Sequence, residues 1–280
     1  MHAVTFDAKV RIPFPDVKSP DSQSVYIFNM YRAASTATTV VIRALADCTD
    51  LVQFNVADVL NEVGVALVDH SDFTRPSLFV AEEAGNLAQL GQFGGYIYSG
   101  FREIPVGYAR QFIFHAASVL VVRDLRDIAI SQYKIVKRHR ISGAAGGNIK
   151  KLREITEQQT LDEFMVSADT IRFLKRLANC YRPVIRKGTK VLRFENYISD
   201  GAFDTGRYAL DLVNAMSAYI KLNTSEAEYV RRVKEQISDS QSLKGHSTGG
   251  KIGLHRQLKP ETQEKLAKVL NPELALLGYI

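Results

Sequence analysis

The sequence predicts a three-layer α/β domain in which a mainly parallel central sheet is flanked by helices. Short runs rich in β-branched and aromatic residues alternate with segments of helical periodicity, which favours parallel strands joined by helices. One of the apolar runs ends abruptly in a basic residue, as at the carboxyl end of a buried strand. A chain of 280 residues, 46% of them apolar, can bury a large core. We therefore expect one domain over residues 1–280, with 1–24 as an N-terminal extension.

The first part of the chain begins with a strand, a loop and a helix. A glycine pair later breaks the helical pattern before a second strand. The expected elements are strand Val25–Met30, loop Tyr31–Ala37, helix Thr38–Ala46, helices Ala57–Val68 and Leu78–Gln89, and, after Gly94 and Gly95, strand Tyr96–Ser99.

The second part repeats the alternation of strands and helices. Thr160 followed by Glu163 resembles a capping box, which predicts the start of a long amphipathic helix. The expected elements are strand Val119–Val122, helix Asp127–Lys137, a helix from Thr160 to Tyr181, strand Lys190–Phe194, helices Tyr208–Ile220 and Ser225–Ile237, and a capped helix after Pro260.

Charge and the rare residue types narrow the classes of function. A net charge of +6 and a pI of about 9.2 suit a polyanionic ligand, such as a nucleotide, a nucleic acid or an acidic glycan. Cys48 and Cys180 are too few for a disulfide framework, and the six histidines lack metal-ligand spacing, so we expect no metal. The sequence shows no signal-peptide pattern and no apolar run of roughly 18 residues. We expect a cytoplasmic protein without a membrane span.

The segment Val119–Tyr133 predicts an anion site. Its apolar run ends in Arg123, and Ser131 follows on a helical pattern. Ligands of open α/β sheets bind outside the carboxyl ends of the strands, and a helix N-terminus attracts anions. Arg123 and Ser131 are therefore expected to face one phosphate. The alternative is that Arg123 only pairs with Asp124 or Asp127 at a solvated strand end.

The loop Tyr31–Thr39 lies where a phosphate would be bound, between a strand and its helix. Its small residues let backbone N–H groups approach an anion, and its hydroxyls add donors. The loop lacks the Gly-Lys-Ser/Thr ending of an ATP- or GTP-binding loop. The alternative is that Ser35 or Thr36 simply caps the helix.

Two glycine-rich, basic stretches are expected as mobile loops, at 138–158 and 239–259. Within the second, Gly245–Pro260 offers backbone amides and Lys251 to a phosphate, or is a flexible surface loop. The first is either a loop near the site or a surface connector.

These segments, in their order along the chain, resemble those of the sulfotransferases that use 3′-phosphoadenosine 5′-phosphosulfate (PAPS). Arg123 and Ser131 match the family's 3′-phosphate segment, and Val191–Asp200 matches a later strand end at which Arg193 and Glu195 would be structural. The 5′-phosphosulfate loop, Pro-Lys/Arg-Ser-Gly-Thr/Ser-Thr in the family, matches Arg32, Ala33, Ala34, Ser35 and Thr36. An alternative register places Thr36–Thr39 on Ser-Gly-Thr-Thr. Gly250, Lys251 and Gly253 match the family's late Gly-Lys-x-Gly loop, which also binds the 3′-phosphate.

The resemblance implies a fold like that of the P-loop nucleotide hydrolases and an in-line transfer of a sulfuryl group to a hydroxyl or an amine. PAPS would be the cofactor and would leave adenosine 3′,5′-bisphosphate (PAP). Arg32 would stabilise the charge that develops on the bridging oxygen. The Pro105 anchor places Glu103 on the family's general base, and His115 is the competing base. This chain has no Trp, so the adenine-stacking Trp of the family is absent.

The sequence does not identify the acceptor, and it leaves other functions open. Residues 138–158 and 52–93 would shape a pocket for a small-molecule, lipid or carbohydrate acceptor, with no nucleic-acid partner and with a homodimer left open. The alternative functions are a nucleotide-dependent kinase or phosphotransferase, a non-catalytic polyanion-binding protein on the same fold, and a sulfotransferase-like protein that has lost its activity.

Overall fold

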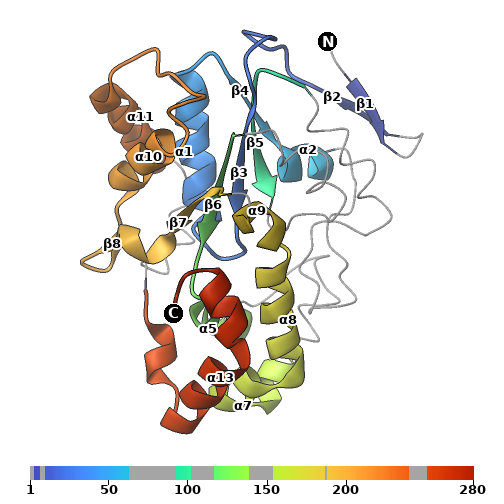
Figure 1. The fold of residues 1–280 in the computed structure, drawn as a ribbon, viewed down its shortest axis with the longest axis vertical. Helices are drawn as coiled ribbons and strands as arrows, with labels where there is room; N and C mark the ends of the chain where they lie inside the picture. Colours follow the sequence, from blue (N-terminus) through green and yellow to red (C-terminus); the bar gives the residue numbers. More distant parts are fainter. Residues whose placement is uncertain are drawn as a thin grey trace.

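A five-stranded parallel sheet forms the centre of the molecule (Figure 1). The computed structural model describes residues 3–6, 10–62, 93–101, 117–138, 154–186, 188–239 and 251–280. The strands stand in the spatial order β4-β5-β3-β6-β7. Their bounds are β3 Val25–Asn29, β4 Val52–Asn55, β5 Tyr96–Phe101, β6 Ala117–Val122 and β7 Lys190–Arg193.

Helices cover both faces of the sheet, which confirms the predicted three-layer α/β class. In Figure 1, α1 lies with α10 and α11 on one side of the sheet and α2 on the other. Burial of every residue of β3 shows that both faces are covered at the centre. The helices are α1 Ser35–Asp47, α2 Val56–Glu62, α5 Leu125–Arg138, α7 Leu161–Val166, α8 Ala168–Asn179, α9 Arg182–Arg186, α10 Thr205–Asn214, α11 Glu226–Asp239 and α13 Pro260–Leu276.

Short elements complete the described part of the chain. β1 Ala3–Phe6 and β2 Val10–Pro13 form an antiparallel hairpin within the expected N-terminal extension. β8 Ile198–Ser199 and β9 Ala202–Phe203 form a second hairpin, and η2 Phe194–Tyr197 and η3 Leu254–Gln257 are 3₁₀ turns. No helix among the described residues is both long and apolar enough to cross a membrane.

The four predicted strands are confirmed, and two predicted helices differ. The helix predicted from Thr160 to Tyr181 is two helices, because Ser167 has an extended backbone (φ −64°, ψ 146°) and accepts a hydrogen bond from the Thr170 amide. The capping box at Thr160 and Glu163 is confirmed. The helix predicted to end at Ile220 ends at Asn214.

Some predicted elements fall outside the described residues. These are helix Leu78–Gln89, the end of helix Ala57–Val68 and most of the two expected loops. Of those loops, residues 154–158 are helical and Leu254–Gln257 form η3.

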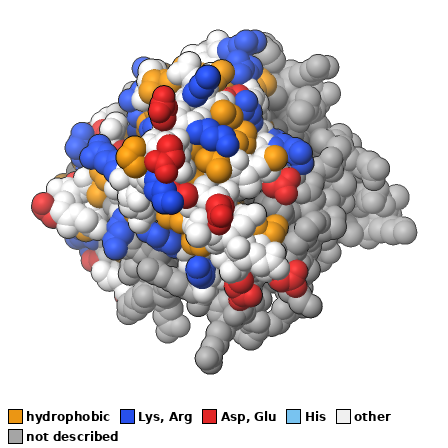
Figure 2. Space-filling view, turned by 90° about the horizontal axis from the view of Figure 1, so that it is seen from below, with side chains coloured by type: hydrophobic (Ala, Val, Ile, Leu, Met, Phe, Trp, Pro, Cys, Tyr) orange, Lys and Arg blue, Asp and Glu red, His pale blue; other side chains and the backbone are white. Residues whose placement is uncertain are grey.

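Figure 2 shows the end of the molecule that carries α7 and α13. Acidic and basic side chains are interspersed on the described part of this face. A continuous basic surface, as a polyanion-binding protein would present, is not seen on that part of the face.

Candidate functional site

The carboxyl ends of β3 and β6 are neighbours at the point where the strand order reverses. Asn29 and Val121 are paired in register, and the Met30 amide donates to the Val121 carbonyl at 2.9 Å. From β3 the chain crosses to β4 on one side, whereas from β6 it crosses to β7 on the other. In open α/β sheets ligands bind in the crevice at such a switch point, and here the β3–α1 loop and Arg123 lie at that point.

The β3–α1 loop presents the start of α1 without a side-chain cap. Ala34 is the N-cap residue and no side-chain cap hydrogen bond is formed, so the alternative in which Ser35 or Thr36 caps the helix is wrong. The first intrahelical bond runs from the Thr38 amide to the Ala34 carbonyl at 2.9 Å. The amides of residues 34–37 therefore have no partner within the helix and are donors for an anion.

Arg32 lies in the same loop in the left-handed backbone region, with φ 62°. Its guanidinium lies 4.8 Å from the centre of the Tyr31 ring, a cation–π distance. The Arg32 Nε is buried and has no hydrogen-bond partner among the described residues. A donor left in this state is available to a ligand that brings an acceptor oxygen.

Arg123 joins three segments of the site. Its side chain donates to the Arg32 carbonyl at 3.1 Å and to the Lys251 carbonyl at 2.8 Å, and its guanidinium lies 4.7 Å from the centre of the Phe194 ring. Only 7% of Arg123 is exposed, so the alternative of a solvated strand end is wrong. Burial lowers the pKa of Arg123, although nearby acidic groups oppose the change. A guanidinium remains charged in proteins, so this is a buried cation.

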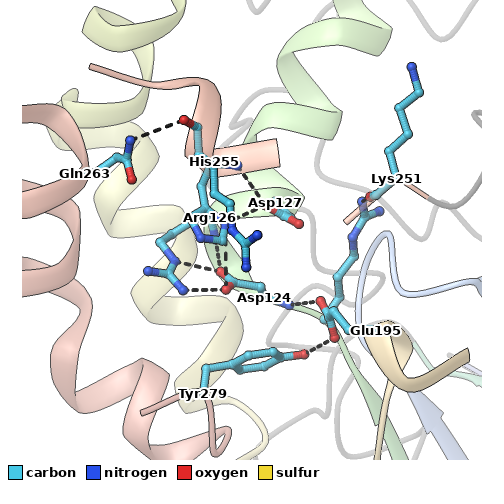
Figure 3. A network of polar contacts seen from close by, with 10 residues as sticks. Asp124, Arg126, Asp127, Glu195, Lys251, His255, Gln263 and Tyr279 are labelled. Carbon is cyan, nitrogen blue, oxygen red and sulfur yellow. Dashed lines mark hydrogen bonds and ion pairs between the residues drawn. The ribbon is translucent and has the colours of Figure 1, made fainter. Parts of the chain in front are cut away.

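The Asp124 and Asp127 carboxylates form hydrogen bonds with residues other than Arg123. Asp124 accepts two hydrogen bonds from the Arg126 guanidinium, at 2.9 and 2.6 Å. Asp127 is fully buried, and one of its oxygens lies 3.0 Å from the His255 amide and 2.8 Å from His255 Nδ1 (Figure 3). This pair attaches the C-terminal segment to the first turn of α5.

The pKa of Asp127 reflects two opposing effects. Burial pushes the pKa upward, but the hydrogen bonds from the His255 side chain and amide, with the charge of Arg123, outweigh burial and lower it. Asp127 is therefore ionised at neutral pH and acts as a charged acceptor.

Glu195 supports the site from the end of β7, in the structural role expected from the sequence. It accepts from the Asp124 amide at 2.9 Å and from the Tyr279 hydroxyl at 2.6 Å. Figure 3 shows these groups together, with the Lys251 side chain directed away from them. Lys251 is thus held in the site by its backbone carbonyl, while its ammonium group is directed elsewhere.

The structure brings many of the predicted residues together. Ala33, Ala34, Ser35 and Thr36 lie at the crevice with Arg32, and Arg123 links that loop to the segment of Lys251 and Gly253. Ser131 is partly exposed on α5, the helix that follows Arg123. Glu103, His115 and Gly250 lie outside the described residues.

A small cavity lies between α1 and the ends of β4 and β5. Its volume is about 60 Å³, and it is lined by Ser35 and Thr39 of α1 and by residues at the ends of β4 and β5, including Asn55, Ser99 and Gly100. Ser99 is 3% exposed, and its hydroxyl has no partner among the described residues. Within those residues, no group of His, Cys, Asp or Glu side chains is arranged to hold a metal ion.

Comparison with known proteins shows the fold. No family model matches the chain, and no curated protein matches it. Among solved structures, mouse sulfotransferase SULT7A1 complexed with PAP aligns with a TM-score of 0.50 at 9% sequence identity, covering 94% of this chain and 91% of that one. Retinol dehydratase, in complex with androsterone and inactive cofactor PAP, aligns with a TM-score of 0.41 at 12% identity, covering 92% and 83%. The chain thus has the fold of a sulfotransferase, as its sequence segments predict.

Proposed function

We propose that this protein transfers a sulfuryl group from PAPS to a hydroxyl or amine of an acceptor. The observation that carries the proposal is the position of Arg123, whose two hydrogen bonds join the Arg32 loop and the Lys251 segment at the switch point of the sheet. The two loops that the sequence assigns to the two ends of one nucleotide therefore lie at one crevice.

The donors in the crevice fit the phosphate and sulfate groups of PAPS. Arg32 Nε and Arg123 Nε are buried N–H groups without partners among the described residues, and the amides at the start of α1 have no intrahelical partner. We assign Arg32, Ala33, Ala34, Ser35 and Thr36 to the 5′-phosphosulfate, and Arg123, Ser131, Gly250, Lys251 and Gly253 to the 3′-phosphate.

When bound, PAPS supplies the sulfuryl group, whose bond to the 5′-phosphate oxygen breaks as the acceptor oxygen or nitrogen bonds to sulfur. Arg32 stabilises the negative charge left on the bridging oxygen, and the loop amides hold the phosphate. Glu103 takes the proton that the acceptor loses, with His115 as the alternative base. Neither step requires a metal ion.

The acceptor group enters from the side of the small cavity. The cavity borders Ser35 of the phosphosulfate loop and the end of β5, and Glu103 follows the last residue of β5 by only two positions in the sequence. Hydroxyl and amide side chains line it together with Asp58 and apolar residues, and these polar groups suit the hydroxyl or amine of the acceptor.

Transfer of labelled sulfate from PAPS to a mixture of phenols, alcohols, amines and glycans tests the function. We expect PAPS-dependent labelling by the wild type, and we expect Glu103→Gln to lose at least about 100-fold in rate, because general bases contribute about 10²–10⁴-fold. The variant should keep its affinity for PAP. Normal transfer by Glu103→Gln would remove Glu103 as the base, and a wild type that binds PAP but transfers no sulfate would contradict the function.

A further inference from the structure

The phosphosulfate loop holds two residues in a backbone conformation that only glycine adopts readily. Arg32 has φ 62° and Ala34 has φ 59°. For residues with a Cβ atom, this left-handed region costs roughly 1–2 kcal/mol each. Sulfotransferase loops of the kind that this one resembles carry glycine at the position of Ala34. Other parts of this chain must therefore hold the loop in place.

Asn29, at the end of β3, donates hydrogen bonds to the loop and to α1. Only 5% of the residue is exposed. The Nδ2 group donates to the Ala33 carbonyl at 2.7 Å and to Thr38 Oγ1 at 3.1 Å. Both hydrogens of the amide are thus used, one on the loop and one on the first turns of α1.

Tyr208 of α10 completes the network through Thr38. Thr38 Oγ1 donates its single hydrogen to the Ala34 carbonyl at 3.0 Å, so the Tyr208 hydroxyl, 2.8 Å away, is the donor in the contact between them. Tyr208 is fully buried and its ring packs against Tyr197 and Phe203, at 5.1 and 5.3 Å between ring centres. Burial raises the pKa of Tyr208, so its hydroxyl keeps its proton.

The direction of these bonds determines where the loop amides point. In a trans peptide unit, the C=O and the N–H point in opposite directions. The Ala33 carbonyl faces Asn29, so the Ala34 N–H of the same peptide unit points away from Asn29. The Ala34 carbonyl faces Thr38, so the Ser35 N–H points away from Thr38. These are two of the amides that have no partner within α1.

We propose that Asn29 and Tyr208, acting through Thr38, are positioning residues that hold the loop amides toward the 5′-phosphate of the nucleotide. The inference rests on the proposed function. Ala34 is strained in the left-handed conformation, whereas glycine would not be. The hydrogen bonds of the network stabilise Ala34 in this conformation and so compensate for the absence of glycine. The network also couples α10 to nucleotide binding, through Tyr208, which lies 170 residues after Thr38 in the chain.

Calorimetric titration with two nucleotides tests this assignment. PAP carries both phosphates, whereas adenosine 3′-monophosphate lacks the 5′-phosphate. Tyr208→Phe removes only the hydroxyl, and it should lower the affinity for PAP about tenfold, the effect of one lost hydrogen bond, while leaving the affinity for adenosine 3′-monophosphate within about twofold. Asn29→Ala should show the same selective loss.

Two further variants separate positioning from general stability. Tyr229→Phe is the matched control, because Tyr229 is also fully buried and its hydroxyl bonds to the Val41 carbonyl, away from the loop; both affinities should stay unchanged. Adding Ala34→Gly to Tyr208→Phe should restore part of the affinity for PAP, since glycine adopts the left-handed backbone without strain.

An unchanged affinity for PAP in Tyr208→Phe, or an equal loss for both nucleotides, would overturn the positioning role. A wild type that binds neither nucleotide would instead contradict the proposed function.

Discussion

Asp127 shows how one buried carboxylate can position a segment that is distant in the sequence. A single oxygen bonds to both the amide and the ring nitrogen of His255, 128 residues away. His255 directly follows the segment whose Lys251 carbonyl accepts from Arg123. The Asp127–His255 pair therefore stabilises one side of the proposed nucleotide site without itself having to touch a nucleotide.

We expect Asp127→Asn to lower the free energy of unfolding at pH 7 by about 2 kcal/mol, because hydrogen bonds to charged groups contribute about 1.5–3 kcal/mol. The folded protein lowers the pKa of Asp127 below the unfolded value of about 3.9, so this stabilisation is complete above about pH 4 and is lost as the pH falls through the lowered pKa. Urea unfolding between pH 3 and pH 8 should show the gap between wild type and variant narrowing in acid. A gap that widens in acid would contradict the assignment.

Some residues of the candidate site could be predicted from the sequence, and others could not. Arg123 could be predicted, because a basic residue directly after an apolar run is visible locally. Tyr208 and the Asp127–His255 pair could not, because their partners come together only when the sheet forms. Their contacts cross up to 170 residues, and no local pattern marks them.

At the scale of elements, β5 carries an irregularity that shapes the cavity. Tyr26 pairs with Tyr98 but Phe28 pairs with Phe101, so β5 has one residue more than β3 between these pairs. The irregularity contains Gly100, which has φ 83° and lies so close to Asn55 that a Cβ atom would be 2.0 Å from the Asn55 side-chain oxygen. Glycine at this position lets the ends of β4 and β5 approach each other.

We expect Gly100→Ala to lower the free energy of unfolding by more than about 2 kcal/mol, since a left-handed alanine alone costs roughly 1–2 kcal/mol and the clash adds to it. Gly201→Ala is the matched control, with φ 76° and no atom within 4 Å of the added Cβ. Urea denaturation of both variants measures the difference. Equal losses would show that the contact with Asn55 contributes nothing.

The elements that the sequence predicted well are those with continuous apolar runs. β3 and β6 are such strands, and they form the centre of the sheet. β4 was not predicted; it is only four residues long, and only Phe54 is buried. The break at Ser167 was missed because the helical periodicity continues across it, and only the backbone of one residue separates α7 from α8.

At the scale of the whole molecule, the candidate site is assembled from segments that span most of the chain. The loop after β3, the turn after β6 and the C-terminal segment meet at the switch point of the sheet, and Arg123 bonds to the other two. The sequence predicted these three segments separately, and their order matched a known family. The functional roles of all the predicted site residues, Glu103, His115, Ser131 and Gly250 included, stay predictions.

If Arg123 and the two loops it joins bind a nucleotide, calorimetric titration of the wild type with PAP will detect it. Arg172→Ala serves as the control, because Arg172 is an exposed arginine on α8 whose side chain is 68% accessible. We predict one saturable site in the wild type and in the control, and a loss of affinity of about 100-fold in Arg123→Ala, since a buried charged donor contributes about 1.5–3 kcal/mol. No binding by the wild type, or equal affinity in Arg123→Ala, would show that this junction is not the nucleotide site.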